Sequence, residues 1–175
     1  MNTPASLVNI LLFEDDEDDV FLLEDTLRAM PDVRAKLVWE PRPNRFKTHL
    51  QDGHWDLIFV DGYMGAFHAV DLISLLRQEK VNVPIIVLTG ADNPDLDNAV
   101  LNAGADDYVV KDRLSPIFIE RVIRYNLERY KQNQRIHALN QELEARVQER
   151  TAELTGLNLA LQENEQQAQL LKQVA

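Results

Sequence analysis

The sequence predicts an α/β protein, with a doubly wound parallel sheet in residues 1–115 and a long helix in residues 116–175. Two observations predict this. Through residues 7–113, short apolar runs alternate with segments whose apolar residues recur at helical spacing. Strands that alternate with helices form right-handed βαβ units in a parallel sheet. From Ser115-Pro116 onward the pattern becomes uninterrupted helical periodicity, with no further proline and one glycine, Gly156.

Five short apolar runs are predicted as strands. The central ones are continuously apolar, which is typical of strands that helices cover on both faces. The second run is followed by Pro41 and Pro43, and proline cannot donate a ladder hydrogen bond. The predicted strands cover residues 8–13, 35–39, 57–60, 84–88 and 108–110.

Four segments between these runs are predicted as helices. Their apolar residues recur three or four positions apart, and Pro31, Asp52-Gly53 and Gly104 end three of them. Gly104 is expected to adopt the left-handed conformation that often follows a helix. The predicted helices cover residues 18–30, 45–51, 70–79 and 93–103.

The fifth helix is expected to begin at Pro116, capped by Ser115. It should cover the sheet to about residue 130 and continue as a coiled coil over about 136–171. A heptad pattern predicts a seam, defined here by Ile136, Asn140, Leu143, Val147, Arg150, Leu154, Leu157 and Leu161. Since one helix cannot bury this seam alone, we expect a homodimer. A solvated, frayed tail is the alternative.

Charge and composition exclude several classes of function. The chain has 175 residues, 29 acids and 18 bases. All of the excess acid lies in residues 1–113, so we expect no direct nucleic-acid binding through a general positive field. Without cysteine, no thiolate metal site or cysteine nucleophile is possible. No apolar run is long enough to span a membrane, and a cytoplasmic location is expected.

Polar side chains follow four of the five predicted strands. Ligands of open parallel sheets bind at the carboxyl ends of the strands, and here these ends carry Glu14, Asp15, Asp61, Thr89 and Lys111. Crowded carboxylates favour a bound cation, and an all-oxygen site suits Mg²⁺. A carboxylate beside Mg²⁺ can attack a phosphoryl group, while a lysine and a hydroxyl stabilise the transferred charge. Taken alone, Asp15 and the following acid would be read as helix caps.

Four motifs give residues 7–130 a specific resemblance. LLFEDD (11–16), DLIFVD (56–61), PIIVLTG (84–90) and DDYVVKD (106–112) occur in the order and at the spacing of the receiver domain of bacterial two-component response regulators. The resemblance implies a flavodoxin-like (βα)5 fold with strand order 2-1-3-4-5. It also implies phosphorylation by a histidine kinase or a phosphotransfer protein, with Mg²⁺ or Mn²⁺ as cofactor.

Roles carry over by position. The resemblance implies that Asp61 is the phosphoacceptor and that Glu14, Asp15, Asp61 and the backbone carbonyl of Tyr63 bind the metal. Thr89 and Lys111 would contact the phosphoryl group. Thr89 and Tyr108 would form the switch, and Tyr63 and Ala91 occupy positions that tune the lifetime of the phosphorylated state.

Three residues depart from the family pattern. Gly65 stands where the family often has proline, Ala69 replaces a usual glycine, and Asp112 replaces the proline that usually follows the lysine. The first two make the loop over residues 62–69 unusual. A bulky Tyr63 is expected to hinder water and to lengthen the life of the acyl phosphate.

The predicted function is a phosphorelay switch, a signalling receiver rather than a metabolic enzyme, that acts through the fifth helix on a dimeric coiled coil and an output module or partner. LNQELEARVQERTAEL (139–154) resembles linkers that precede further modules in signalling proteins. Because the sequence ends at Ala175, we expect a shortened chain or a short regulator that works through dimer geometry. The main alternative is a constitutive dimerisation module without phosphotransfer. A dehalogenase-type phosphohydrolase would need an acid at Tyr63, and a nucleotide binder would need a glycine-rich loop after the first strand.

Overall fold

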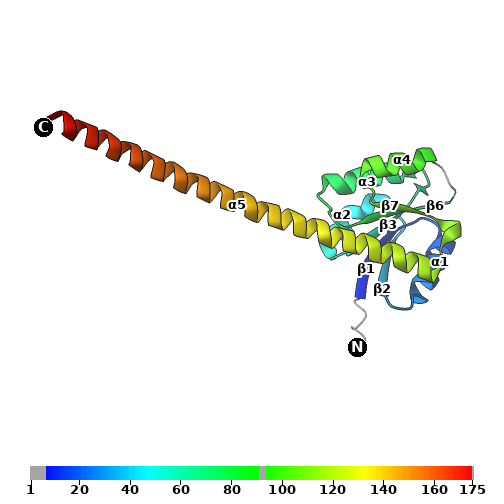
Figure 1. Cartoon of the computed structure of the whole chain (residues 1–175). Coiled ribbons are helices and arrows are strands. Elements are labelled where there is room, and N and C mark those ends of the chain that lie inside the picture. Colours follow the sequence, from blue (N-terminus) through cyan, green and yellow to red (C-terminus); the bar gives the residue numbers. More distant parts are fainter. Residues whose placement is uncertain (1–6, 91–93, 175) are drawn as a thin grey trace. The chain divides into compact units, whose positions relative to one another are not determined.

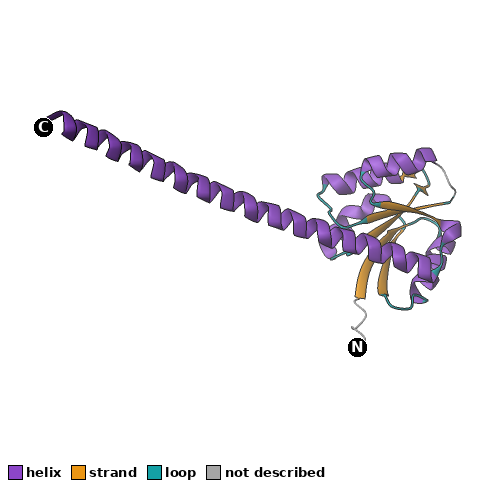
Figure 2. Cartoon of the chain, viewed as in Figure 1, coloured by secondary structure: helices purple, strands orange, loops and turns teal. Residues whose placement is uncertain are grey.

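A five-stranded parallel sheet forms the centre of the first part of the chain (Figures 1 and 2). The computed structural model describes residues 7–90 and 94–174. The strands are β1 (Leu7–Phe13), β2 (Arg34–Glu40), β3 (Leu57–Asp61), β6 (Ile85–Thr89) and β7 (Asp107–Val110). Their order, β2-β1-β3-β6-β7, is the predicted 2-1-3-4-5 order. The doubly wound, flavodoxin-like prediction is therefore confirmed.

Helices cover both faces of this sheet (Figure 1). The helices are α1 (Glu17–Arg28), α2 (Phe46–Asp52), α3 (Ala69–Gln78), α4 (Pro94–Ala103) and α5 (Pro116–Val174). Side chains of α2, α3 and α4 pack on one face of the sheet, while those of α1 and the start of α5 pack on the other. Short 3-10 turns, η1 (Pro43–Arg45) and η2 (Lys111–Arg113), precede α2 and follow β7.

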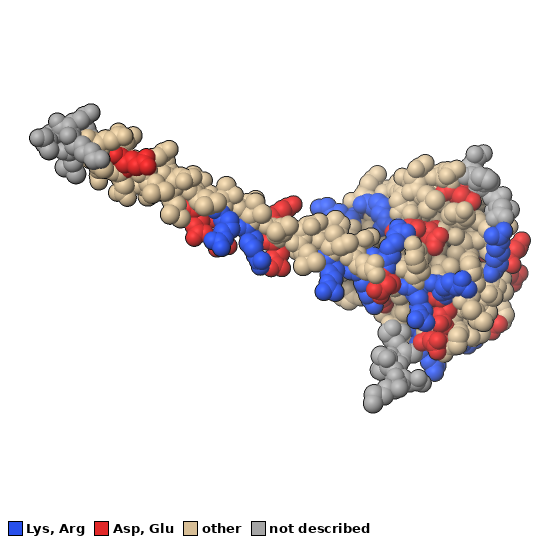
Figure 3. Space-filling model, viewed as in Figure 1, with Lys and Arg blue, Asp and Glu red and all other residues tan. Residues whose placement is uncertain are grey.

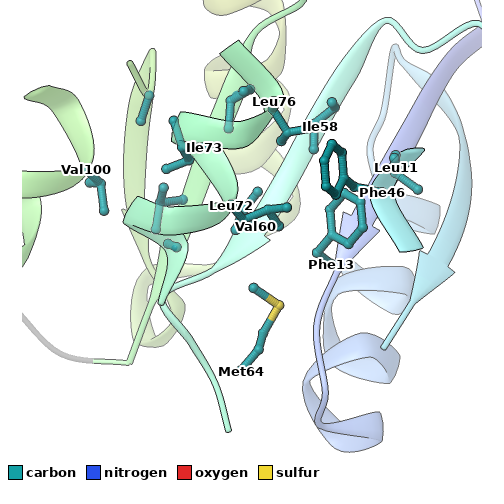
Figure 4. Packing of buried hydrophobic residues seen from close by; sticks show 14 residues of the cluster. Leu11, Phe13, Phe46, Ile58, Val60, Met64, Leu72, Ile73, Leu76 and Val100 are labelled. Carbon is teal, nitrogen blue, oxygen red and sulfur yellow. The ribbon is translucent and has the colours of Figure 1, made fainter. Parts of the chain in front are cut away.

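The central strands contribute to both cores because successive side chains of a strand point to opposite faces. In β1, Leu11 and Phe13 join the core under α2 and α3, whereas Ile10 and Leu12 join the core under α1 and α5. Phe13 lies against Phe46 of α2 in Figure 4. Each such side chain contributes roughly 1.5–3 kcal/mol when fully buried. The sheet is therefore a rigid support for the residues at its edge.

The loop after β3, which the sequence marks as unusual without indicating its form, is a short hairpin. It contains two short antiparallel strands, β4 (Tyr63–Met64) and β5 (Phe67–His68), joined through Gly65 and Ala66. Gly65 has φ +59°, a left-handed conformation. Proline, with φ fixed near −65°, cannot adopt it. Glycine in place of the family's proline at position 65 therefore allows the turn of this hairpin, which proline would prevent.

Helix α5 is continuous from Pro116 to Val174. The chain divides into two units, Met1–Tyr130 and Lys131–Ala175. In the single chain, the seam side chains are all exposed. Among the described residues, no helix combines the length and the apolar character needed to cross a bilayer. Coiled-coil pairing stays a prediction.

Candidate functional site

Three carboxylates gather at the carboxyl edge of the sheet. Glu14 and Asp15 directly follow β1, and Asp61 is the last residue of β3, which pairs with β1 through Phe13 and Val60. One oxygen of each carboxylate lies within 4.8 Å of the others. Glu14 and Asp61 are buried, whereas Asp15 is exposed. The sheet therefore brings together the three acids that the sequence predicts, with one side open to solvent.

Lys111 supplies a positive charge that pairs with two of these carboxylates. Its Nζ lies 2.6 Å from Asp61 Oδ1 and 2.8 Å from Glu14 Oε2. Lys111 also pairs with a carboxylate outside this group, because its Nζ lies 2.5 Å from Oδ2 of Asp19 in α1. Burial alone would lower the pKa of the Lys111 ammonium, but these hydrogen bonds outweigh burial and raise the pKa far above its ordinary value. Lys111 therefore carries a positive charge at neutral pH.

Glu14 is held firmly on both its backbone and its side chain. The Trp39 indole Nε1 donates to the Glu14 carbonyl oxygen at 2.7 Å, and the Asp16 N–H donates to Glu14 Oε1 at 3.2 Å. Burial raises the pKa of Glu14 above its ordinary value, and Lys111 only partly offsets this. The negative charge of Asp61 adds to the increase. An added cation at this point would relieve that electrostatic cost.

Asp16, the next acid along the chain, caps a helix, whereas Asp15 belongs to the acidic group. Asp16 caps α1, because its Oδ1 accepts the Asp18 N–H at 2.8 Å. The capping interpretation therefore holds for Asp16. Asp15 instead lies in the acidic group, and its Oδ2 would be 3.8 Å from a Cβ added at Gly65. The tip of the β4–β5 hairpin thus lies beside the acidic group.

The backbone after Asp61 orients this carboxylate. The Tyr63 N–H donates to Asp61 Oδ2 at 2.9 Å, and the Gly62 N–H donates to the Leu88 carbonyl of β6 at 2.8 Å. Tyr63 is 52% exposed, with its ring edge-to-face against His68 at a centroid distance of 5.3 Å. Asp61 is thereby fixed at one oxygen by the backbone and at the other by Lys111.

Thr89 ends β6 beside these groups. Its Cγ2 would lie 3.9 Å from a Cβ added at Gly62, the residue after Asp61. The side chain is buried, and its Oγ1 has no hydrogen-bond partner among the described residues. Leaving a buried hydroxyl without a partner is costly and unusual in a folded protein. A phosphoryl oxygen bound at the site is the kind of acceptor that this hydroxyl lacks.

Two further residues that the sequence predicts for the site, Tyr108 and Ala91, are not brought into the acidic group by the described structure. Tyr108 is on the edge strand β7, with its side chain 36% exposed. Ala91 lies outside the described residues. Three contributors were not predicted: Asp19 on Lys111, Trp39 on the Glu14 carbonyl, and His68 against the Tyr63 ring. The sequence hint for Asp19 was its place as an acid in the first turn of the helix that follows the first strand, close to the predicted site.

The donor set fits a hard divalent cation. Glu14, Asp15 and Asp61 offer oxygen ligands only, which suits Mg²⁺ or Mn²⁺ and not a thiophilic metal. A cation of this kind would compensate the repulsion between the two buried carboxylates.

Fold and site together define a class: a flavodoxin-like α/β domain with an acidic, cation-competent site at the carboxyl edge of its sheet. Within that class the family is clear. The family model for the response regulator receiver domain matches residues 10–123. The chain therefore belongs to the receiver domain family.

Curated relatives agree with this family. The chain is 27% identical over 140 residues to the transcriptional regulatory protein MalR of Bacillus subtilis, with 78% of this chain and 56% of MalR covered. It is 31% identical over 122 residues to the transcriptional regulatory protein PrrA of Mycobacterium bovis, with 70% of this chain and 51% of PrrA covered. The chain spans about half the length of these relatives.

A solved structure gives the same fold. The signal receiver domain of an HD domain-containing protein from Pseudomonas fluorescens Pf-5 superimposes with a TM-score of 0.62 at 20% identity. The match covers 73% of this chain and 99% of that one.

Proposed function

We propose that this chain is a phosphoacceptor response regulator, in which a histidine kinase or a phosphotransfer protein phosphorylates Asp61. One observation carries the proposal: a buried Asp61 carboxylate lies 2.6 Å from the Lys111 ammonium and within 4.8 Å of Glu14 and Asp15. This arrangement places a nucleophile, a fixed cation and a pair of metal-competent acids around one point. Mg²⁺ or Mn²⁺ held by Glu14, Asp15, Asp61 and the Tyr63 carbonyl would neutralise phosphoryl oxygens.

The chain's own residues perform the remaining steps. An Asp61 oxygen attacks phosphorus in line with the leaving group, so that an O–P bond forms as the donor's N–P bond breaks. The donor nitrogen leaves with that electron pair and is protonated. Lys111, which stays protonated, balances the charge on the equatorial oxygens. The Thr89 hydroxyl, for which the described residues offer no hydrogen-bond partner, donates to one of these oxygens.

The same proposal includes the switch. As Thr89 turns toward the phosphoryl group it vacates space that Tyr108 can occupy, which alters the surface of α4, β7 and the start of α5. Tyr63 and Ala91 would set the lifetime of the phosphorylated state. In the division that we propose, residues 1–115 are the receiver core. The helix of residues 116–175 carries the change to a homodimeric coiled coil and to an output module or partner in the cytoplasm.

Asp61→Asn tests the acceptor. We expect the wild-type chain with Mg²⁺ and labelled acetyl phosphate to take up label that hydroxylamine removes, as an acyl phosphate requires, and Asp61→Asn to take up none. Asp112→Asn is a matched control, because this exposed acid follows Lys111 at the same edge. It should be labelled like the wild type.

The two possible failures have different meanings. Undiminished labelling of Asp61→Asn would show that the acceptor is another residue. A wild-type chain that takes up no label from acetyl phosphate or from a phosphorylated kinase domain would favour the constitutive dimerisation module.

A further inference from the structure

Lys111 has a partner that lies outside the acidic group. Asp19, in the first turn of α1, places Oδ2 2.5 Å from Lys111 Nζ, the shortest of the three ion pairs of this ammonium. The Asp19 side chain is 36% exposed, while that of Lys111 is 13% exposed. The group that could hold a cation consists of Glu14, Asp15 and Asp61, and Asp19 is not part of it. Asp19 therefore reaches the site through its ion pair with Lys111.

The ammonium has three protons, and it pairs with three carboxylates among the described residues. Two of these partners, Glu14 and Asp61, are also the buried members of the cation-competent group. Lys111 and a divalent cation would therefore be held by the same two carboxylates, and two cations at one pair of carboxylates repel each other. Of these three partners, Asp19 is the one that Lys111 would not share with the cation.

We propose that Asp19 is a positioning residue that retains Lys111 beside Asp61 when a divalent cation occupies Glu14 and Asp61. The inference rests on the proposed function. With Asp19 present, the ammonium gives up two contacts and keeps the third, so it stays within reach of the phosphoryl group. Without Asp19, every partner of Lys111 is one that the cation needs. The lysine then opposes cation binding or leaves the site.

Two simpler roles must be separated from this one. An acid in the first turn of a helix favours the helix dipole, and any acid near the site attracts cations. Asp18 provides both effects without the contact, because it precedes Asp19 in the same turn and is exposed. Its backbone N–H binds Asp16, and in the described part of the chain its carboxylate forms no ion pair with Lys111. Asp18→Asn is therefore the matched control for Asp19→Asn.

Calorimetric titration of the full chain with MgCl2, without a phosphodonor, tests the proposal. We expect Asp19→Asn to weaken Mg²⁺ binding at least five-fold more than Asp18→Asn does. In a Lys111→Gln background, where no ammonium competes, the two asparagine variants should weaken binding by the same small factor. Such a double-mutant cycle isolates the coupling between Asp19 and Lys111. Circular dichroism melting of each variant verifies that the fold is retained.

Two results would overturn the proposal. One is an equal loss from Asp19→Asn with and without Lys111, which would reduce Asp19 to a source of negative charge. The other is tighter Mg²⁺ binding by Asp19→Asn. Because this measurement contains no phosphodonor, failure of the Asp61 labelling experiment would end the proposed function and leave the coupling result standing.

Discussion

Glu14 shows how a single buried carboxylate links stability to ligand binding. Its pKa is raised chiefly by burial, so the folded protein resists the ionised form. A raised pKa means that the folded state binds more protons than the unfolded state between the two pKa values. The stability that goes with the protonated carboxyl is therefore fully present below the ordinary value of 4.5 and is lost as the pH rises through the folded pKa.

Glu14→Gln should therefore stabilise the metal-free protein at neutral pH. The amide keeps an oxygen for the Asp16 N–H and removes the buried charge. We expect a higher melting midpoint than that of the wild type, because the neutral amide carries no charge for burial to penalise. Thermal melts from pH 7 down to pH 4 in a chelator measure it, and the gain should shrink as the pH falls.

Added MgCl2 provides the control for this variant. A cation that binds only the folded state stabilises it by RT ln(1 + [L]/Kd), so the stability rises with the concentration of the cation. The wild type should gain stability with Mg²⁺ while Glu14→Gln gains little. A Glu14→Gln variant that is less stable than the wild type at pH 7 in chelator would contradict the prediction. It would show that the ion pair between Glu14 and Lys111 stabilises the fold by more than the burial of the Glu14 charge costs.

At the scale of elements, the β4–β5 hairpin is the feature that depends most on one residue. Gly65 at φ +59° forms its turn, and other L-residues pay about 1–2 kcal/mol in this conformation. We expect Gly65→Ala to lower the free energy of unfolding by about that amount. Gly65→Asn should lose less, because asparagine tolerates left-handed φ. Urea denaturation of the three chains measures both values.

A second glycine is the control for this prediction. Gly90 has no left-handed φ, and in the described part of the chain a Cβ added there meets no atom within 4 Å beyond its chain neighbours. Gly90→Ala should leave the urea midpoint almost unchanged. Equal losses at Gly65 and Gly90 would mean that the backbone of the hairpin relaxes without strain.

The hairpin also shows where the sequence stops being informative. The sheet and its order could be predicted because continuous apolar runs alternate with helical periods over many residues. Two-residue strands such as Tyr63–Met64 have too few positions to show a period. Gly104 was predicted to be left-handed from its place after a helix, and its φ is +108°. The hairpin turn at Gly65 had no such neighbouring pattern.

The site could be predicted to a similar extent. Glu14, Asp15, Asp61, Thr89 and Lys111 were found because each stands at a strand end, where a parallel sheet gathers its polar residues. Asp19 was hidden in an unbroken acidic run, and its contact with Lys111, which the sequence does not reveal, sets it apart from Asp18. That Thr89 Oγ1 finds no hydrogen-bond partner among the residues described likewise depends on tertiary packing.

For the whole molecule, the open question is what covers the C-terminal helix. A helix in water gains most of its stability by packing an apolar face. The seam leucines are more than half exposed in the single chain, and acidic and basic side chains are interspersed along the same helix (Figure 3). The mixed charge gives no uniform repulsion between two copies. A second copy of the chain is thus a suitable partner for the seam.

Two leucines of nearly equal exposure offer a matched test of that pairing. Leu157 is a seam residue and is 54% exposed, whereas Leu159 lies off the seam and is 57% exposed. In a coiled coil, only the former is buried, and a fully buried leucine contributes roughly 1.5–3 kcal/mol. Leu157→Gln should therefore raise the dissociation constant of the dimer at least ten-fold in sedimentation equilibrium, and Leu159→Gln should not change it. Equal effects of the two substitutions, or a wild-type chain that stays monomeric at every concentration, would contradict a dimer built on this heptad.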